Sequence, residues 1–182
     1  MKIGVYGGSF NPPHLGHVRA AQACKQALGL DRVLVIPASI PPHKQLTSSS
    51  ASPEERLALT RLAFENLPGF EVLDLEIRRE GKSYTVDTIR ELKAQYAHDE
   101  LFLMMGTDMF LSFQDWYSPQ EIARCAQLVC FSRYDADAEN RAALQNAHGG
   151  SYASCCVRFL SRRRKSRART ESSHTAKPSS CK

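Results

Sequence analysis

The chain has 182 residues and six cysteines, and its formal net charge is +5. This length fits one domain with a substantial core. The sequence has no apolar run near the roughly 18 residues of a membrane span, no signal-peptide pattern and no Cys-x-x-Cys pair. We therefore expect a cytoplasmic protein with reduced thiols, and neither a disulfide framework nor a zinc site.

The positive charge is concentrated near the C-terminus. Residues 1–150 contain 15 Lys and Arg against 18 Asp and Glu, whereas residues 151–182 contain 9 basic residues and one acidic residue, Glu171. The body of the chain therefore gives no reason to expect nucleic-acid binding. We divide the chain into a body, residues 1–150, and a basic segment rich in Ser and Arg, residues 151–182.

The first expected element is a short apolar strand at residues 3–6, which runs into a glycine turn at residues 7–8. A helix through about Leu28 follows, and His14 and His17 lie at its start. This order of strand, turn and helix exposes backbone N–H groups to an anion, and the helix dipole adds partial positive charge there. The spacing matches neither the P-loop pattern nor Gly-x-Gly-x-x-Gly.

Four more strands are expected in the body, at residues 32–36, 70–77, 101–105 and 128–131. Most are short apolar runs, typical of strands buried on both faces of a parallel sheet. Between and after them the sequence predicts helices at residues 53–67, 86–96, 119–125 and 136–147. Ser52 and Ser118 each begin an expected capping box, and Thr85 is an expected N-cap.

Strands that alternate with helices predict an α/β fold with a doubly wound, Rossmann-like parallel sheet. Ligands bind such sheets beyond the carboxyl ends of the strands. The unusual stretches of this sequence all fall at those ends, at residues 7–17, 37–44, 83–85, 106–116 and 132–133. We therefore expect one ligand site at that edge of the sheet.

The opening stretch Gly7-Gly8-Ser9-Phe10-Asn11-Pro12-Pro13-His14-Leu15-Gly16-His17 resembles the signature of the nucleotidylyltransferase superfamily, x-Phe-x-Pro-x-His-x-Gly-His. Within that superfamily it is most similar to the bacterial nicotinate-nucleotide adenylyltransferase family. Three later stretches also resemble that family. They are Pro41-Pro42-His43-Lys44, Ser83-Tyr84-Thr85-Val86-Asp87-Thr88, and Gly106-Thr107-Asp108 with Trp116 eight residues beyond Asp108.

The resemblance implies an enzyme of NAD synthesis that transfers the adenylyl group of ATP to nicotinate mononucleotide, giving nicotinate adenine dinucleotide and pyrophosphate. Catalysis of such a step is mainly positioning and electrostatic stabilisation. Mg²⁺ would be held largely by ATP phosphates and water, so no protein metal ligand is expected. The expected partners are ATP and the mononucleotide, with no membrane and no nucleic acid.

On the ATP side, the resemblance implies contacts from the glycine turn and the start of the first helix. The candidate ATP-binding residues are Gly7, Gly8, Ser9, Phe10, His14, His17 and Arg133. The candidate catalytic residues are His14, His17 and Lys44. We expect His17 nearest the reacting α-phosphate and Lys44 as a point charge on the outer phosphates. For Arg133 a solvated side chain is the alternative to a phosphate contact.

On the mononucleotide side, the candidate residues are Ser83, Tyr84, Thr85, Gly106, Asp108, Trp116 and Tyr117. A helix start at Thr85 and the backbone N–H of Tyr117 would hold the nicotinate carboxylate. Asp108 would accept hydrogen bonds from a ribose. Trp116, the only tryptophan, would stack on the pyridine ring through its flat, extended face.

The sequence departs from the family pattern after about residue 147. The expected Ile-Ser-Ser/Thr-x-x-Ile-Arg-like segment, which would grip the ATP phosphates, is not found. Cys155-Cys156 and a basic run stand in its place, and the composition of residues 151–182 predicts disorder. Loss of the reading frame after about residue 150 is our hypothesis for this change. The alternative is a real basic arm that binds nucleic acid or anionic lipid.

Several other functions stay open from the sequence. Phosphopantetheine adenylyltransferases share the fold and His-x-Gly-His, but usually have Thr in place of His14. A preference for nicotinamide mononucleotide would depend on backbone contacts, which a sequence does not show. Outside this enzyme class, the chain fits a catalytically impaired nucleotide-binding protein or a basic-tailed RNA-binding module.

Overall fold

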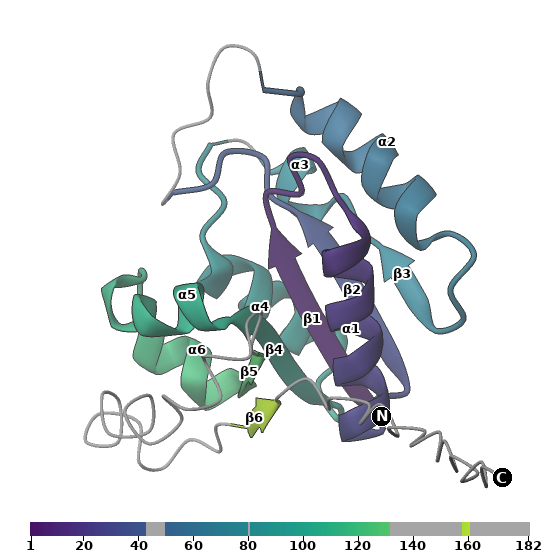
Figure 1. Cartoon of the computed structure of the whole chain (residues 1–182). Helices are drawn as coiled ribbons and strands as arrows, with labels where there is room; N and C mark the ends of the chain where they lie inside the picture. Colours follow the sequence, from purple (N-terminus) through teal and green to yellow (C-terminus); the bar gives the residue numbers. More distant parts are fainter. Residues whose placement is uncertain (43–49, 80, 132–157, 161–182) are drawn as a thin grey trace, which may run out of the picture.

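The computed structural model describes residues 1–42, 50–79, 81–131 and 158–160 (Figure 1). Its strands form one six-stranded sheet in the order β3-β2-β1-β4-β5-β6, with every neighbouring pair parallel. The expected Rossmann-like parallel sheet is confirmed. The strands are β1 Lys2–Gly8, β2 Arg32–Pro37, β3 Phe70–Val72, β4 Glu100–Gly106, β5 Gln127–Phe131 and β6 Arg158–Leu160.

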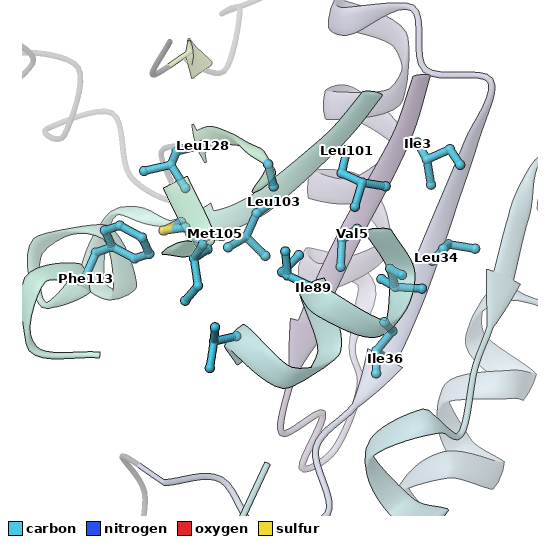
Figure 2. Packing of buried hydrophobic residues seen from close by; sticks show 14 of the residues in the cluster. Ile3, Val5, Leu34, Ile36, Ile89, Leu101, Leu103, Met105, Phe113 and Leu128 are labelled. Carbon is cyan, nitrogen blue, oxygen red and sulfur yellow. The ribbon is translucent and has the colours of Figure 1, made fainter. Parts of the chain in front are cut away.

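Helices cover both faces of the sheet in the described part of the chain. They are α1 Leu15–Leu28, α2 Pro53–Phe64, α3 Leu75–Arg78, α4 Thr85–Gln95, α5 Thr107–Leu111 and α6 Pro119–Cys125, with a 3-10 turn, η1, at Phe113–Asp115. Because successive strand residues point to opposite faces, the core is split into two clusters. Val33 and Val35 pack with α1 and α2, whereas Leu34 packs with α4, α5 and α6. Figure 2 shows the second of these clusters, around Ile89 of α4.

The strand expected over residues 70–77 is only partly correct. Strand β3 ends at Val72, and the chain forms the one-turn helix α3 instead. The carbonyl of Asp74 accepts hydrogen bonds from the N–H groups of Ile77 and Arg78, and its carboxylate pairs with Arg78 at 3.0 Å. Because β3 is an edge strand, continuing it would leave one row of these backbone groups unpaired, whereas the helical turn satisfies them.

One of the two expected capping boxes forms. The Ser52 hydroxyl accepts a hydrogen bond from the Glu55 N–H, and the Glu55 carboxylate accepts one from the Ser52 N–H. Ser118 makes no such bond, because its φ of 53° is left-handed and Arg90 binds the Glu121 carboxylate at 2.5 and 2.6 Å. The second box was therefore wrong, although helix α6 begins where it was expected.

Strand β6 lies within the basic segment of residues 151–182. It pairs in parallel with β5, so residues 158–160 belong to the sheet. The helix expected at residues 136–147 and the remainder of the basic segment lie outside the described residues. Among the described helices none has the length and apolar character needed to cross a membrane.

Candidate active site

The pocket of interest lies where the order of the strands in the sheet reverses. Strand β1 sits between β2 and β4, and the helices that precede these two strands, α1 and α4, lie on opposite faces of the sheet. This arrangement leaves a crevice beyond the carboxyl ends of the strands. A pocket occupies this position, lined by residues 5–10 at the end of β1 and 103–106 at the end of β4. This is the edge at which the sequence predicted a ligand site.

Most of the predicted site residues meet in this pocket although they are far apart in sequence. Those that line it are Gly7, Gly8, Ser9, Phe10, His17, Ser83, Thr85, Gly106, Asp108 and Trp116. His14, Tyr84 and Tyr117 are described but do not line it. Lys44 and Arg133, together with His43, lie outside the described residues.

Strand β1 continues through Gly7 and Gly8, so the turn predicted at residues 7–8 begins only at Ser9, and the name glycine turn is kept for residues 7–10. Phe10 fixes the shape of this turn. Its backbone has a positive φ of 45°, which is uncommon for a residue with a side chain, and its ring is only 1% exposed. The ring packs edge-on against Tyr6 at 5.5 Å and against His17 at 5.2 Å between centroids. Burial of this large ring offsets the backbone strain and holds the turn against the start of α1.

Helix α1 begins with a capping box made from two histidines. Nδ1 of His14 accepts a hydrogen bond from the Gly16 N–H at 3.1 Å, and Nδ1 of His17 accepts one from the His14 N–H at 3.2 Å. The two rings lie 3.9 Å apart between centroids. A Cβ at residue 16 would come within 2.8 Å of the His14 ring, so this cap requires glycine there. The His-x-Gly-His spacing is thus explained by helix capping.

The cap also determines where each imidazole carries its proton. Because Nδ1 accepts a hydrogen bond in both rings, the proton of each neutral ring lies on Nε2. His17 lines the pocket, whereas His14 is exposed outside it. His17 therefore lines the pocket with a ring whose N–H is on Nε2, and the structure does not bring His14 to the pocket wall.

Arg56 of α2 holds two pocket loops together from behind. Its side chain is 0% exposed, and its guanidinium donates to the carbonyls of Ser9 at 2.7 Å, Ala38 at 2.6 Å and Ser39 at 2.8 Å. Burial lowers the pKa of the guanidinium, and the charge of Glu54 opposes this effect. Arg56 thus ties the glycine turn to the loop after β2. The sequence analysis missed it, although its i, i+4, i+8 spacing with the buried residues Thr60 and Phe64 was a usable signal.

Ser83 anchors the opposite side of the same loop. Its hydroxyl accepts a hydrogen bond from the Ser39 N–H at 2.9 Å, and its own N–H donates to the Ile40 carbonyl at 3.0 Å. Arg56 binds the Ser39 carbonyl, so the peptide groups on both sides of Ser39 are fixed. The loop leads directly to Pro41 and Pro42, which line the pocket.

Glu76 of α3 is a pocket residue that the sequence analysis missed, because the run around it was read as a strand. The side chain is 6% exposed and lines the pocket. Its carboxyl accepts a hydrogen bond from the Thr88 hydroxyl at 2.7 Å, and the Ser83 hydroxyl is a second polar neighbour that lowers its pKa. Burial raises the pKa of Glu76 to about 7, whereas these two hydroxyls and the charge of Arg79 act to lower it. An acidic residue inside an apolar run was the available signal.

The turn before α4 and the loop after α5 meet beside the pocket. The rings of Tyr84 and Tyr117 lie 5.1 Å apart between centroids, and Trp116 packs on Phe113 at 5.3 Å. Trp116 lines the pocket, while the side chain of Tyr117 is 59% exposed. The two tyrosines therefore join the loops that carry the predicted mononucleotide residues.

Helix α4 starts at Thr85, one residue earlier than predicted. Its N-cap is Tyr84, and no side chain caps its first turn. Thr85 lines the pocket, so the positive end of the helix dipole lies at the pocket wall. This arrangement suits a ligand carboxylate.

Comparison of the sequence with known families and proteins gives a consistent result. The sequence model of the cytidylyltransferase-like family matches residues 5–173, which reaches beyond residue 147. A protein of Shewanella sp. (strain MR-7), "Probable nicotinate-nucleotide adenylyltransferase", is 43% identical over 133 residues, which are 73% of this chain and 62% of that protein. A protein of Shouchella clausii with the same description is 40% identical over 140 residues, 77% of this chain and 72% of its own length. The chain thus spans less than two thirds of the Shewanella protein.

Solved structures with the same fold include the nicotinic acid mononucleotide adenylyltransferase of Plasmodium falciparum complexed with NaAD. It superposes with a TM-score of 0.71 at 14% sequence identity, covering 88% of this chain and 74% of that one. At this identity the likeness concerns the fold alone.

Proposed function

Because the chain belongs to the cytidylyltransferase-like family, we propose that it transfers the adenylyl group of ATP to nicotinate mononucleotide. The products are nicotinate adenine dinucleotide and pyrophosphate. The observation that carries this proposal is the pocket between β1 and β4. The glycine turn, His17, Thr85 and Trp116 all line it. The descriptions of the Shewanella and Shouchella proteins support the choice of substrate.

The reaction is an in-line displacement at phosphorus. The phosphate of the mononucleotide attacks the α-phosphorus of ATP, one P–O bond forms, and the bond to pyrophosphate breaks. The attacking phosphate is already anionic, so no protein base is needed. His17 would donate its Nε2–H to the reacting α-phosphate, and the backbone of residues 7–10 would bind the remaining phosphate oxygens.

Further phosphate contacts are proposed for residues that do not line the described pocket. Lys44 would bind the outer phosphates as a point charge, and Arg133 would make a second phosphate contact. Both lie outside the described residues. His14 would act through the helix cap that orients His17.

The mononucleotide would occupy the part of the pocket between α4 and Trp116. The start of α4 at Thr85 and the backbone N–H of Tyr117 would bind the carboxylate, with Trp116 stacked on the pyridine ring. Asp108, which is exposed and lines the pocket, would accept hydrogen bonds from the ribose. The Ser83–Tyr84 turn and Gly106 would complete this side.

A divalent cation would be bound at this site mainly by the phosphates of ATP. Among the described residues no group of three or more His, Cys, Asp or Glu is arranged to hold a metal ion. We propose that Mg²⁺ would be held mainly by the ATP phosphates and would neutralise part of their charge. The protein residues then position phosphates and do not need to build a cation cage.

The test is pyrophosphate release by the 182-residue chain with ATP, Mg²⁺ and nicotinate mononucleotide. Parallel reactions contain nicotinamide mononucleotide or phosphopantetheine. We expect release with the nicotinate substrate and much less with the other two. Equal release with nicotinamide mononucleotide would contradict the carboxylate pocket. A folded chain that binds nicotinate mononucleotide without releasing pyrophosphate would be a catalytically impaired member of the family.

A further inference from the structure

Glu76 is a buried acid in the wall of a pocket that the proposed function fills with an anionic ligand. A carboxyl at 6% exposure loses most of its hydration, and a neutral side chain of the same shape would avoid that cost. Its partners are two hydroxyls, and the guanidinium of Arg79 bonds to Thr88 at 3.2 Å and to Glu91 at 2.5 Å. The acid is therefore held by a specific network.

The direction of each hydrogen bond in this network can be assigned. The Thr88 hydroxyl accepts from Arg79 and donates to Glu76. The Ser83 hydroxyl accepts from the Ser39 N–H, which leaves its own proton available to the neighbouring Glu76 carboxyl. An ionised carboxylate only accepts, so it can take both hydroxyl protons and favours the rotamers that direct them toward it.

These two hydroxyls flank the first turn of α4. Ser83 precedes the N-cap and Thr88 follows the N-terminal turn, and both line the pocket together with Thr85. Helix α4 has no side-chain cap of its own. The hydrogen bond from Thr88 to Glu76 connects its N-terminal part to α3. The Ser83 bond to Ser39 extends the same network to the loop that carries Pro41 and Pro42.

We propose that Glu76 is a positioning residue that orients Ser83 and Thr88 and thereby sets the mononucleotide side of the pocket. The inference rests on the proposed function, because it names the ligand that this side receives. The ATP side depends on the glycine turn and on the cap of α1, which make no hydrogen bond to Glu76 in the described part of the chain. Loss of the Glu76 carboxylate should therefore weaken one substrate selectively.

The experiment uses Glu76→Gln in the full chain at pH 8, where the wild-type carboxyl is ionised. Glutamine has the same shape, but its amide nitrogen donates, so the two hydroxyls have only one acceptor oxygen left to share. Binding of nicotinate mononucleotide is followed by fluorescence of Trp116, the only tryptophan, and needs no turnover. KM values for both substrates are measured from pyrophosphate release.

We expect about tenfold weaker binding and about tenfold higher KM for the mononucleotide, with the KM for ATP changed less than about twofold. Thr88→Val removes one hydroxyl and should reproduce this result, whereas Thr88→Ser should restore wild-type binding. The matched control is Glu91→Gln, which removes the same charge from the same Arg79 network at a side chain 47% exposed and outside the pocket.

Other outcomes overturn the inference. Unchanged mononucleotide affinity in Glu76→Gln would show that the carboxyl is structural, and tighter binding would show that its charge opposes the ligand. Equal losses for both substrates would also point to a general structural role. If the wild-type chain binds ATP but does not bind the mononucleotide, the proposed function fails and the inference fails with it.

Discussion

At the scale of single residues, the site depends on charged side chains that are buried and whose polar groups are hydrogen-bonded. Glu76 and Arg56 are both nearly inaccessible to water, and each is satisfied by uncharged partners, hydroxyls for the acid and backbone carbonyls for the base. Their charges are therefore not cancelled by a direct ion pair, and the cost of burial appears as shifted pKa values.

The raised pKa of Glu76 makes stability depend on pH. The acid titrates near 4.5 in the unfolded chain and at about 7 in the folded protein, so the folded state binds the extra proton in between. The free energy of unfolding should therefore be highest below about pH 4.5 as far as this group is concerned, and fall by on the order of 3 kcal/mol as pH rises through 7.

Glu76→Gln removes this contribution. Urea unfolding of both proteins between pH 5 and pH 8 should show the variant gaining relative to the wild type as pH rises. Other titrating groups cancel in the comparison, and the Glu91→Gln control should follow the wild-type curve in parallel. Parallel curves for Glu76→Gln would contradict the shifted pKa.

At the scale of elements, helix starts serve two purposes in this fold. The two histidines that cap α1 satisfy its backbone N–H groups and also place one imidazole in the pocket. A substitution at His17 therefore changes both the helix and the site unless the new side chain can still act as a cap.

His17→Gln separates these two effects. Glutamine at this position can still accept the N-cap N–H, as it does in ordinary capping boxes, but it removes the imidazole donor. We expect the melting temperature to stay nearly unchanged and kcat for adenylyl transfer to fall about 100- to 1000-fold. His14→Ser, which also keeps a cap, should lose less activity because His14 does not line the pocket. Comparable losses in the two variants would contradict this assignment.

The elements that the sequence predicted correctly are those with a strong local signal. Buried apolar runs gave the central strands, and the Ser52 capping box gave the start of α2. The errors arise where a residue distant in sequence determines the local structure. Arg90 binds the Glu121 carboxylate that would have completed a capping box at Ser118. Spacing along a chain does not show such competition.

The candidate site divides in the same way. The motif residues were taken from the family resemblance, and most of them meet in one pocket because parallel strands bring their carboxyl ends to one edge. Glu76 was missed because α3 depends on hydrogen bonds to the Asp74 carbonyl, and Arg56 because its partners are carbonyls in loops. Backbone carbonyls carry no sequence signal, so the spacing of Arg56 with Thr60 and Phe64 could indicate a buried side chain but not the carbonyls that it binds.

At the scale of the whole molecule, Arg56 connects parts of the fold that the sheet alone does not join. It is on α2, and its guanidinium group binds carbonyls just after β1, in the loop after β2 and, through Nε, just before α2 at Ala51. Undocking of α2 would therefore remove the hydrogen bonds that tie these two pocket loops together.

Arg56→Met should destabilise the whole protein. Methionine fills part of the space but leaves the carbonyls of Ser9, Ala38 and Ser39 without this donor, at a cost on the order of 3 kcal/mol. Urea unfolding measures this loss. Arg61→Met is the matched control on the same helix, where the side chain is 54% exposed, and it should change stability by about 0.5 kcal/mol or less. Equal effects of the two substitutions would show that the buried bonds contribute little.

The floor of the pocket is also part of the hydrophobic core, since Val5, Leu103 and Met105 belong to both. A bound nucleotide would therefore extend the packed interior, and occupancy would be linked to folding. At a hundred times its Kd, a ligand that binds only the folded state adds about 2.7 kcal/mol to the free energy of unfolding. In a cell this linkage would make the protein's lifetime against proteases follow the concentration of the ligand that fills the pocket, so that abundance rises with ligand supply.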